Sequence, residues 1–318
     1  MSTPLCELLG IEHPIILAPM GGAVGTELAA AVSNAGGLGL LPLTWSDDPA
    51  SDVEETRRLT SRPFGANLVL EWDQKHRVDA LLDAGVGIVS LFWGDPAPYV
   101  DRIHEAGAIV LHTVGSADEA KRAVQAGVDV IVAQGFEAGG HVWGRVGTIA
   151  LVPAVVDAVA PVPVVAAGGI ADGRGVAAVL ALGAQAAWVG TRFLLAEESP
   201  VHDDYRRRLI AAGETDTEWF EDLFDRGWPD APHRALRNST VDEWEAAGRP
   251  SSGARPGEGD QIATRPDGSA VVRYAASTPS AGMEGDIGAM SLWAGQGVAL
   301  AREVQPAAEI VAELVSRL

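Results

Sequence analysis

Short apolar runs alternate with amphipathic stretches along the first two thirds of the chain. Apolar runs rich in β-branched residues, bounded by Gly, Pro or polar residues, are typical of buried parallel strands. Eight such runs are predicted as strands, at 15–20, 37–43, 64–70, 88–93, 108–114, 130–135, 163–169 and 186–194. Helical periodicity occupies stretches between them, among them 26–35, 74–84, 98–106, 117–126 and 174–182. This alternation favours a parallel sheet built from βαβ crossovers.

Glycines that follow the predicted helices support the same arrangement. Ala-Gly or Leu-Gly pairs recur just before strands, ending at Gly36, Gly85, Gly107, Gly127 and Gly183. A glycine after the last helical turn supplies the left-handed cap that returns the chain to the sheet. An open doubly wound sheet is the alternative, but its GxGxxG fingerprint is absent after the first strand, which ends in APMGG. We therefore predict an α/β protein with a (β/α)8 TIM barrel.

The composition changes after Leu195. The segment 213–282 is polar and rich in Pro and Gly, yet it holds the aromatic residues Trp219, Phe220, Phe224, Trp228 and Trp244. Disordered segments are poor in aromatic residues, so an ordered inserted lid subdomain is predicted. The expected division is a barrel over 1–212, the lid over 213–282 and C-terminal helices over 283–318, where periodicity marks 287–301 and 307–318. Without the lid, the chain keeps about the 250 residues typical of a TIM barrel.

Charge and cysteine content exclude several classes of partner. The 318 residues carry a net charge of −20, which disfavours nucleic acid and anionic membrane surfaces as partners. The single cysteine, Cys6, excludes intrachain disulfides and cysteine metal clusters, and no histidine and carboxylate spacing predicts a metal site. No uninterrupted apolar run is long enough to span a bilayer. We expect a cytoplasmic protein.

Unusual residues follow the predicted strands at the end where TIM-barrel active sites lie. The loops after the seventh and eighth strands, AAGGIADGRG and VGTRF, stand where these barrels commonly bind phosphate with backbone N–H groups. Their glycines could also simply form tight turns. No Walker-type lysine motif is present, so the phosphate is expected to belong to a bound cofactor rather than to a transferred group.

One histidine stands apart from the other six. The sixth strand ends at Gln134 and leads through Gly139 and Gly140 to His141, at the predicted mouth of the barrel. Histidine is the side chain suited to proton transfer near neutral pH. The residues alone leave open whether His141 is functional or structural.

Six segments in this order resemble the nitronate monooxygenase family, formerly called 2-nitropropane dioxygenases. They are HPIILAPMGG, AAAVSNAGGLG, GANL, QGFEAGGH, AAGGIADGRGVAAVLALGAQ and VGTRFL. The resemblance runs from Ile11 to about Ser199 and returns in LWAGQGV and PAAEIVAELV near the C-terminus. It implies an FMN-dependent TIM barrel. FMN-dependent enoyl-acyl carrier protein reductases and NADH:quinone reductases share most of these segments, so the resemblance specifies the superfamily better than the substrate.

The resemblance also implies roles for particular residues. It makes His141 the catalytic residue. The residues expected to contact FMN are Met20, Asn67, Gln134, Gly139, Gly140, Gly169, Trp188, Val189, Gly190 and Thr191. Some relatives have a lysine at the end of the fifth strand, where this chain has Thr113. A cation there would stabilise reduced, anionic flavin, so the redox tuning of the flavin is expected to differ.

The expected activity is FMN-dependent oxidation of alkyl nitronates, such as propionate 3-nitronate, by O2 to carbonyl compounds and nitrite. The expected partners are the nitronate and O2, with a homodimer left open. One alternative is an NAD(P)H-dependent FMN reductase acting on a quinone or an enoyl-acyl carrier protein. A further alternative is a non-redox barrel that binds a phosphorylated metabolite.

Overall fold

A closed barrel of eight parallel strands forms the centre of the molecule. The computed structural model describes residues 2–318. The strands are β1 (Ile15–Leu17), β2 (Gly39–Pro42), β3 (Phe64–Val69), β4 (Ile88–Phe92), β5 (Ile109–Val114), β6 (Val130–Gln134), β8 (Val164–Ala167) and β9 (Ala186–Val189). They follow the order β1-β9-β8-β6-β5-β4-β3-β2, and a parallel bridge between Ile16 and Leu38 joins its two ends. The predicted barrel and its eight strands are confirmed.

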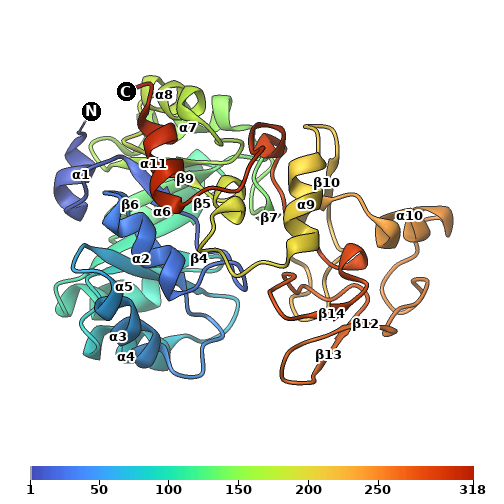
Figure 1. The fold of residues 1–318 in the computed structure, drawn as a ribbon. Helices are drawn as coiled ribbons and strands as arrows, with labels where there is room; N and C mark the ends of the chain where they lie inside the picture. Colours follow the sequence, from blue (N-terminus) through green and yellow to red (C-terminus); the bar gives the residue numbers. More distant parts are fainter. Residues whose placement is uncertain (1) are drawn as a thin grey trace.

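Helices surround this barrel (Figure 1). They are α2 (Thr26–Asn34), α3 (Pro49–Leu59), α4 (Lys75–Asp83), α5 (Ala97–Glu105), α6 (Ala117–Gln125), α7 (Thr148–Val159), α8 (Gly173–Ala181) and α11 (Ala307–Val315). The C-terminal helix α11 packs against both α2 and α8, so it completes the ring next to the first strand. None of the helices within residues 2–318 is long and apolar enough to cross a bilayer.

The core has two layers because successive residues of a strand point to opposite faces. Ile16, Leu40 and Val132 fill the barrel, whereas Ile15, Leu17 and Ile131 pack against the helices. The short helix α1 (Pro4–Leu9) contributes Leu5, Cys6 and Leu9 to the inner layer. It is tied to the turn before β9 by a hydrogen bond from Leu5 N to Gln185 Oε1 of 2.9 Å. Since α1 covers the amino ends of the strands, the carboxyl ends remain for the site.

The chain between β9 and α11 forms a second body beside the carboxyl ends of the barrel (Figure 1). It contains η1 (Thr191–Leu195), α9 (Asp203–Ala211), β10 (Thr217–Phe220), β11 (His233–Leu236), α10 (Ser239–Ala246), β12 (Gln261–Thr264), β13 (Ala270–Val272) and β14 (Glu284–Gly285). Phe220, Phe224 and Trp244 form part of a small core here. The segment 213–282 is thus folded around its aromatic residues. Its boundary with the C-terminal part at 282 stays a prediction. The strand pair of β12 and β14 connects the two sides of that position.

Two predicted elements differ from the structure. The predicted helix at 287–301 is wrong: the chain forms only the short 3-10 helices η2 (Ile287–Ala289) and η3 (Gln296–Leu300). Between them the backbone is extended and pairs with the inserted segment, where Leu236 N donates to Leu292 O at 2.8 Å. Tertiary hydrogen bonds therefore outweigh the local helical pattern. The eighth strand ends at Val189, not at 194, because the chain turns at Gly190 into η1.

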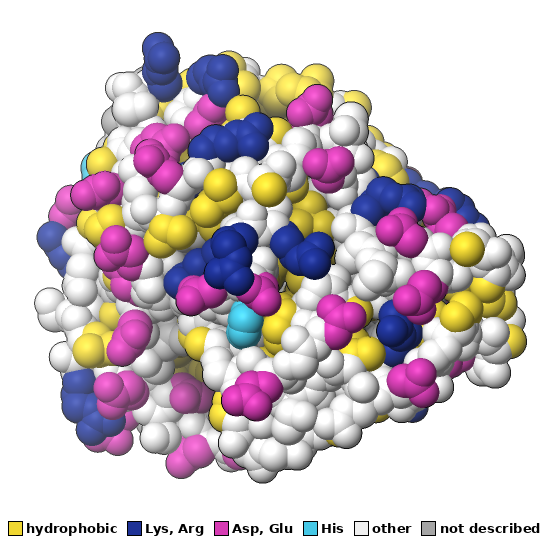
Figure 2. Space-filling view, turned by 45° about the vertical axis from the view of Figure 1, so that its right-hand side comes forward, with side chains coloured by type: hydrophobic (Ala, Val, Ile, Leu, Met, Phe, Trp, Pro, Cys, Tyr) yellow, Lys and Arg dark blue, Asp and Glu magenta, His cyan; other side chains and the backbone are white. Residues whose placement is uncertain are grey.

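Figure 2 shows the molecule turned so that the inserted segment comes forward. Acidic and basic side chains are interspersed on this face, with hydrophobic side chains between them. The net charge of −20 is therefore not gathered there into one acidic patch.

Candidate active site

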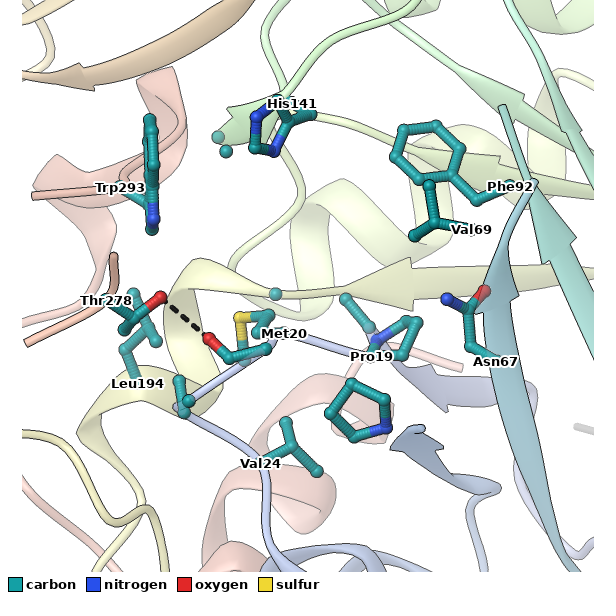
Figure 3. A pocket seen from close by; sticks show the side chains of 18 of the residues that line it. Pro19, Met20, Val24, Asn67, Val69, Phe92, His141, Leu194, Thr278 and Trp293 are labelled. Atoms are coloured by element: carbon teal, nitrogen blue, oxygen red, sulfur yellow. Dashed lines mark hydrogen bonds between the residues drawn. The ribbon is translucent and has the colours of Figure 1, made fainter. Parts of the chain in front are cut away.

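A cavity of about 870 Å3 opens at the carboxyl ends of the barrel strands. Its walls come from the loops after the strands, from the inserted segment and from residues 293–297. Figure 3 shows this cavity from close by, with Met20 and Pro19 opposite His141 and with Asn67 and Phe92 at one side. Of the predicted site residues, the cavity is lined by Met20, Asn67, Gln134, Gly139, Gly140, His141, Gly169, Trp188, Gly190 and Thr191.

Val189 does not line the cavity. Its side chain is fully buried between the barrel and the helices, on the opposite face of β9 from Trp188. Alternation along the strand is the physical reason, so a contact of Val189 with FMN stays a prediction for its backbone alone. Its carbonyl oxygen accepts a hydrogen bond from Ala18 N at 2.9 Å within the barrel.

One end of the cavity is built from backbone N–H groups. Within residues 2–318, no protein acceptor pairs with the N–H groups of Gly169, Ile170, Gly190 or Thr191. Gly169 has a φ of 72°, a left-handed conformation that glycine adopts without steric cost. Thr191 Oγ1 accepts from Gly295 N at 3.0 Å, which leaves its hydroxyl proton free to donate. Unpaired donors at the ends of two adjacent strands suit a phosphate group.

The middle of the cavity offers few polar side chains. Asn67 Oδ1 accepts a hydrogen bond from Ser90 Oγ at 2.9 Å, and its amide nitrogen turns toward the cavity (Figure 3). Thr113 also lines the wall, so no cation stands at the end of β5. Thr278 of the inserted segment donates to Gly21 O at 2.6 Å, the dashed line in Figure 3. Together with the backbone donors, these groups fit a flat polar ring system that carries a phosphate, as FMN does.

The side chain of Gln134 forms hydrogen bonds with the backbone of the loop that carries His141. Its Nε2 donates to His141 O at 3.0 Å, and its Oε1 accepts from Trp143 N at 2.9 Å. The side chain thus bridges the loop that carries His141, while one amide proton remains for a ligand. Gly139 passes so close to Gly295 that a Cβ would collide with the Gly295 backbone nitrogen. Both residues therefore shape the loop as well as the cavity.

His141 is held by a strand pair that joins the barrel to the inserted segment. It lies in β7 (Gly140–His141), which pairs with β11 so that His141 is opposite His233. Its ring stacks on Trp228 with centroids 3.9 Å apart and an interplanar angle of 28°. The ring of Trp293 lies 5.3 Å away. The inserted segment and the chain that follows it thus fix the orientation of the imidazole.

The surroundings of His141 keep it neutral. Burial, and secondarily the nearby His233, holds the pKa of His141 well below its usual range. The His141 Nε2 is buried and has no hydrogen-bond partner within residues 2–318. A neutral imidazole with free nitrogens can accept a proton or donate one hydrogen bond.

Sequence reasoning missed the aromatic residues around this histidine. Trp45, Phe92, Trp228 and Trp293 line the cavity with it, yet they come from four distant parts of the chain. The only signal was compositional: nine tryptophans in 318 residues, three of them within the polar inserted segment. Within the same residues 2–318, no cluster of three or more His, Cys, Asp or Glu could hold a metal ion.

Fold and site together define a class of protein. A (β/α)8 barrel with unpaired backbone donors after its last two strands, and a neutral histidine across the cavity from them, is typical of cofactor-dependent barrel enzymes. The model of the family described as nitronate monooxygenase matches residues 2–76 and 69–317. The chain belongs to the nitronate monooxygenase family.

Individual relatives carry different names. A (3aS,4S,5R,7aS)-5-hydroxy-7a-methyl-1-oxo-octahydro-1H-indene-4-carboxyl-CoA dehydrogenase from Mycobacterium tuberculosis is 39% identical over 78% of this chain and 70% of its own. A nitronate monooxygenase from Paraburkholderia phytofirmans is 35% identical over 99% of this chain and 94% of its own. The structure of FabK from Thermotoga maritima matches 100% of this chain and 96% of its own with a TM-score of 0.82 and 32% identity. The chain is thus an oxidoreductase that acts on small molecules, and its family implies a flavin cofactor.

Proposed function

We propose that this protein binds FMN and oxidises an alkyl nitronate with O2 to a carbonyl compound and nitrite. The observation that carries the proposal is the neutral His141 ring, which lines the cavity and whose buried Nε2 has no hydrogen-bond partner within residues 2–318. A buried ring nitrogen left without a partner is costly unless a ligand uses it.

The residues that would hold FMN are the unpaired N–H groups of Gly169, Ile170, Gly190 and Thr191 for the phosphate, and Asn67 for the ring. When bound, FMN would take electrons from the substrate and pass them to O2. Thr113 is neutral, so the end of β5 would offer no positive charge to the reduced ring.

His141 would do one of two things, depending on the form of the substrate. It can donate a hydrogen bond from one ring nitrogen to a nitro oxygen of a preformed nitronate. It can also accept the proton on the carbon next to the nitro group of a neutral nitroalkane. Because its pKa is held low, the ring is ready to accept this proton at neutral pH. The stacked Trp228 shields one face of the ring from water.

A pair of substrates separates these roles. His141→Ala is expected to keep its bound flavin and to lose about 10²- to 10⁴-fold in kcat/KM with neutral 2-nitropropane. The loss with the preformed nitronate should be smaller, because no proton has to be removed. His112→Gln is the matched control, since His112 is buried in β5 outside the cavity. Full turnover by His141→Ala on both substrates would rule the assignment out.

A second candidate is oxidation or reduction of a bulky acyl thioester at the same site. Arg226 and Arg265 line the cavity, and neither has a carboxylate partner within residues 2–318, so they could receive the phosphates of a carrier such as coenzyme A. The named activity of the 39% identical Mycobacterium tuberculosis relative supports this reading. Anaerobic mixing separates the candidates: flavin bleaching by a nitronate alone supports the first. Bleaching by NAD(P)H or by an acyl-coenzyme A alone supports the second.

A further inference from the structure

Five aromatic side chains form one continuous cluster beside His141, here called the tryptophan wall: Trp45, Trp72, Phe92, Trp93 and Trp228. Trp45 follows β2, Trp72 follows β3, and Phe92 and Trp93 stand at the end of β4. Trp228 comes from the inserted segment. Loops after three neighbouring barrel strands and the inserted segment therefore contribute to a single surface.

Trp228 is the centre of the tryptophan wall. Its ring centroid lies 5.2 Å from that of Trp93, 5.4 Å from Trp72 and 6.0 Å from Trp45, all in edge-to-face geometry. Trp72 also contacts Trp45 in the same geometry at 5.4 Å. Edge-to-face packing is a preferred arrangement of aromatic rings, so each indole helps to fix its neighbours.

Only part of the wall faces the cavity. Trp45, Phe92 and Trp228 line it, whereas Trp72 and Trp93 pack on Trp228 without lining it. Trp45 is 53% exposed, although a large indole gains most when it is covered. Trp93 has a φ of 64°, a left-handed conformation that is strained for a bulky residue. Such strain persists where the surroundings enforce it, and it is concentrated at functional sites.

We propose that the tryptophan wall binds a flat apolar group of the substrate, an aromatic or fused-ring hydrocarbon attached to the carbon that bears the nitro group. The inference rests on the proposed function, whose substrate it narrows. A short aliphatic nitronate would leave the faces of Trp45 and Phe92 in water, whereas a ring system would cover them. The wall itself carries no charged side chain, so it favours an uncharged group.

The position of the wall fits the chemistry of the site. Trp228 belongs to the wall and also stacks on His141, with 3.9 Å between ring centroids. A ring system lying against Trp228 and Phe92 therefore brings its attached carbon to the neighbourhood of the imidazole. The wall would select the substrate, and His141 would act on the carbon next to the selected group.

The first test compares substrates in the holoenzyme. The nitronate of 2-(nitromethyl)naphthalene is expected to exceed propionate 3-nitronate and the nitronate of 2-nitropropane in kcat/KM by about 10- to 100-fold. Trp45→Ala should lower kcat/KM for the naphthyl substrate about tenfold more than for either short substrate, so the preference for the naphthyl group should disappear. Trp219→Ala is the matched control, because Trp219 packs on Phe136 outside the cavity.

The second test measures binding without turnover. Carboxylates are planar anions of similar shape to nitronates, so 2-naphthylacetate and propionate serve as unreactive probes. Perturbation of the flavin absorbance should show that 2-naphthylacetate binds at least about tenfold more tightly than propionate, and that Trp45→Ala removes this difference. Equal affinity for the two probes, or no effect of Trp45→Ala, would overturn the inference.

The two tests together distinguish failure of the wall from failure of the proposed function. If 2-naphthylacetate binds in a Trp45-dependent way but no nitronate is oxidised, the wall stands and the nitronate activity falls. If short nitronates are oxidised as fast as the naphthyl substrate and the probes bind equally, the activity stands and the wall falls.

Discussion

Replacing Gln134 by leucine should disorganise the loop that carries His141. The leucine side chain has a similar size but can neither donate to His141 O nor accept from Trp143 N, which now lie 3.0 and 2.9 Å from the amide. The strand pair with β11 and the stacking of His141 on Trp228 would then still hold the loop from its other side. We expect His141 to sample more orientations, while the barrel stays folded.

The magnitude follows from the two hydrogen bonds. Each contributes about 0.5–1.5 kcal/mol net, so their loss should weaken the ordered loop by about 1–3 kcal/mol. If His141 reacts only from the ordered loop, kcat should fall by about 5- to 100-fold. The flavin content should change little, because the phosphate donors of Gly169 and Gly190 are not affected.

The assay is steady-state turnover of a nitronate together with the ratio of flavin to protein in the purified variant. Gln296→Leu is the matched control: the same chemical change at an exposed residue outside the cavity. Unchanged kcat in Gln134→Leu would refute the reasoning. A different result is loss of most of the flavin with unchanged kcat in the fraction that retains it. This result would instead support the direct contact of Gln134 with FMN that the sequence predicts.

Two further predictions concern the cofactor site and pH. Gly190→Val should reduce flavin retention at least about tenfold, because even the Cβ of the new side chain would lie 3.3 Å from Ala18 Cβ and 3.4 Å from Met20 Sδ. The flavin absorbance of the purified variant measures this retention. A variant that keeps its flavin would contradict the prediction. Burial lowers the pKa of His112 and of His233 to about 4, below the value of about 6.5 in the unfolded chain. The unfolded state therefore binds more protons between these values, and each histidine should cost about 1.4 kcal/mol of stability per unit as pH falls from 6.5 toward 4. Urea unfolding of the wild type and of His112→Gln at several pH values checks this. The free energy of unfolding of the variant should change less with pH, because one fewer proton is taken up on unfolding. Identical slopes of unfolding free energy against pH would contradict the prediction.

The barrel could be predicted because its signals are local. Each strand is a short apolar run and each return from a helix carries its own glycine, so no knowledge of distant contacts is needed. The helix predicted at 287–301 was wrong for the opposite reason. Its apolar pattern is helical, but Leu292 pairs with Leu236, and Gly295 donates to Thr191. These partners are far apart in sequence, and no local pattern marks them.

The candidate site divides in the same way. The glycine turns after β8 and β9 and the loop of His141 are continuous segments, so they could be placed at the cavity from the sequence. The orientation of Val189 could not be predicted, because the register of β9 decides which side chains face the cavity and a short apolar run does not reveal it. The tryptophan wall was missed because its residues meet only in the folded chain.

Anaerobic mixing of the purified holoprotein with a nitronate, followed by absorbance, is the most direct test of the proposed oxidation. We expect a protein that purifies with FMN or takes it up, whose flavin is bleached by the nitronate alone and regains its colour when O2 is admitted. A colourless protein that does not take up FMN, or a flavin bleached by NAD(P)H but not by any nitronate, would contradict it.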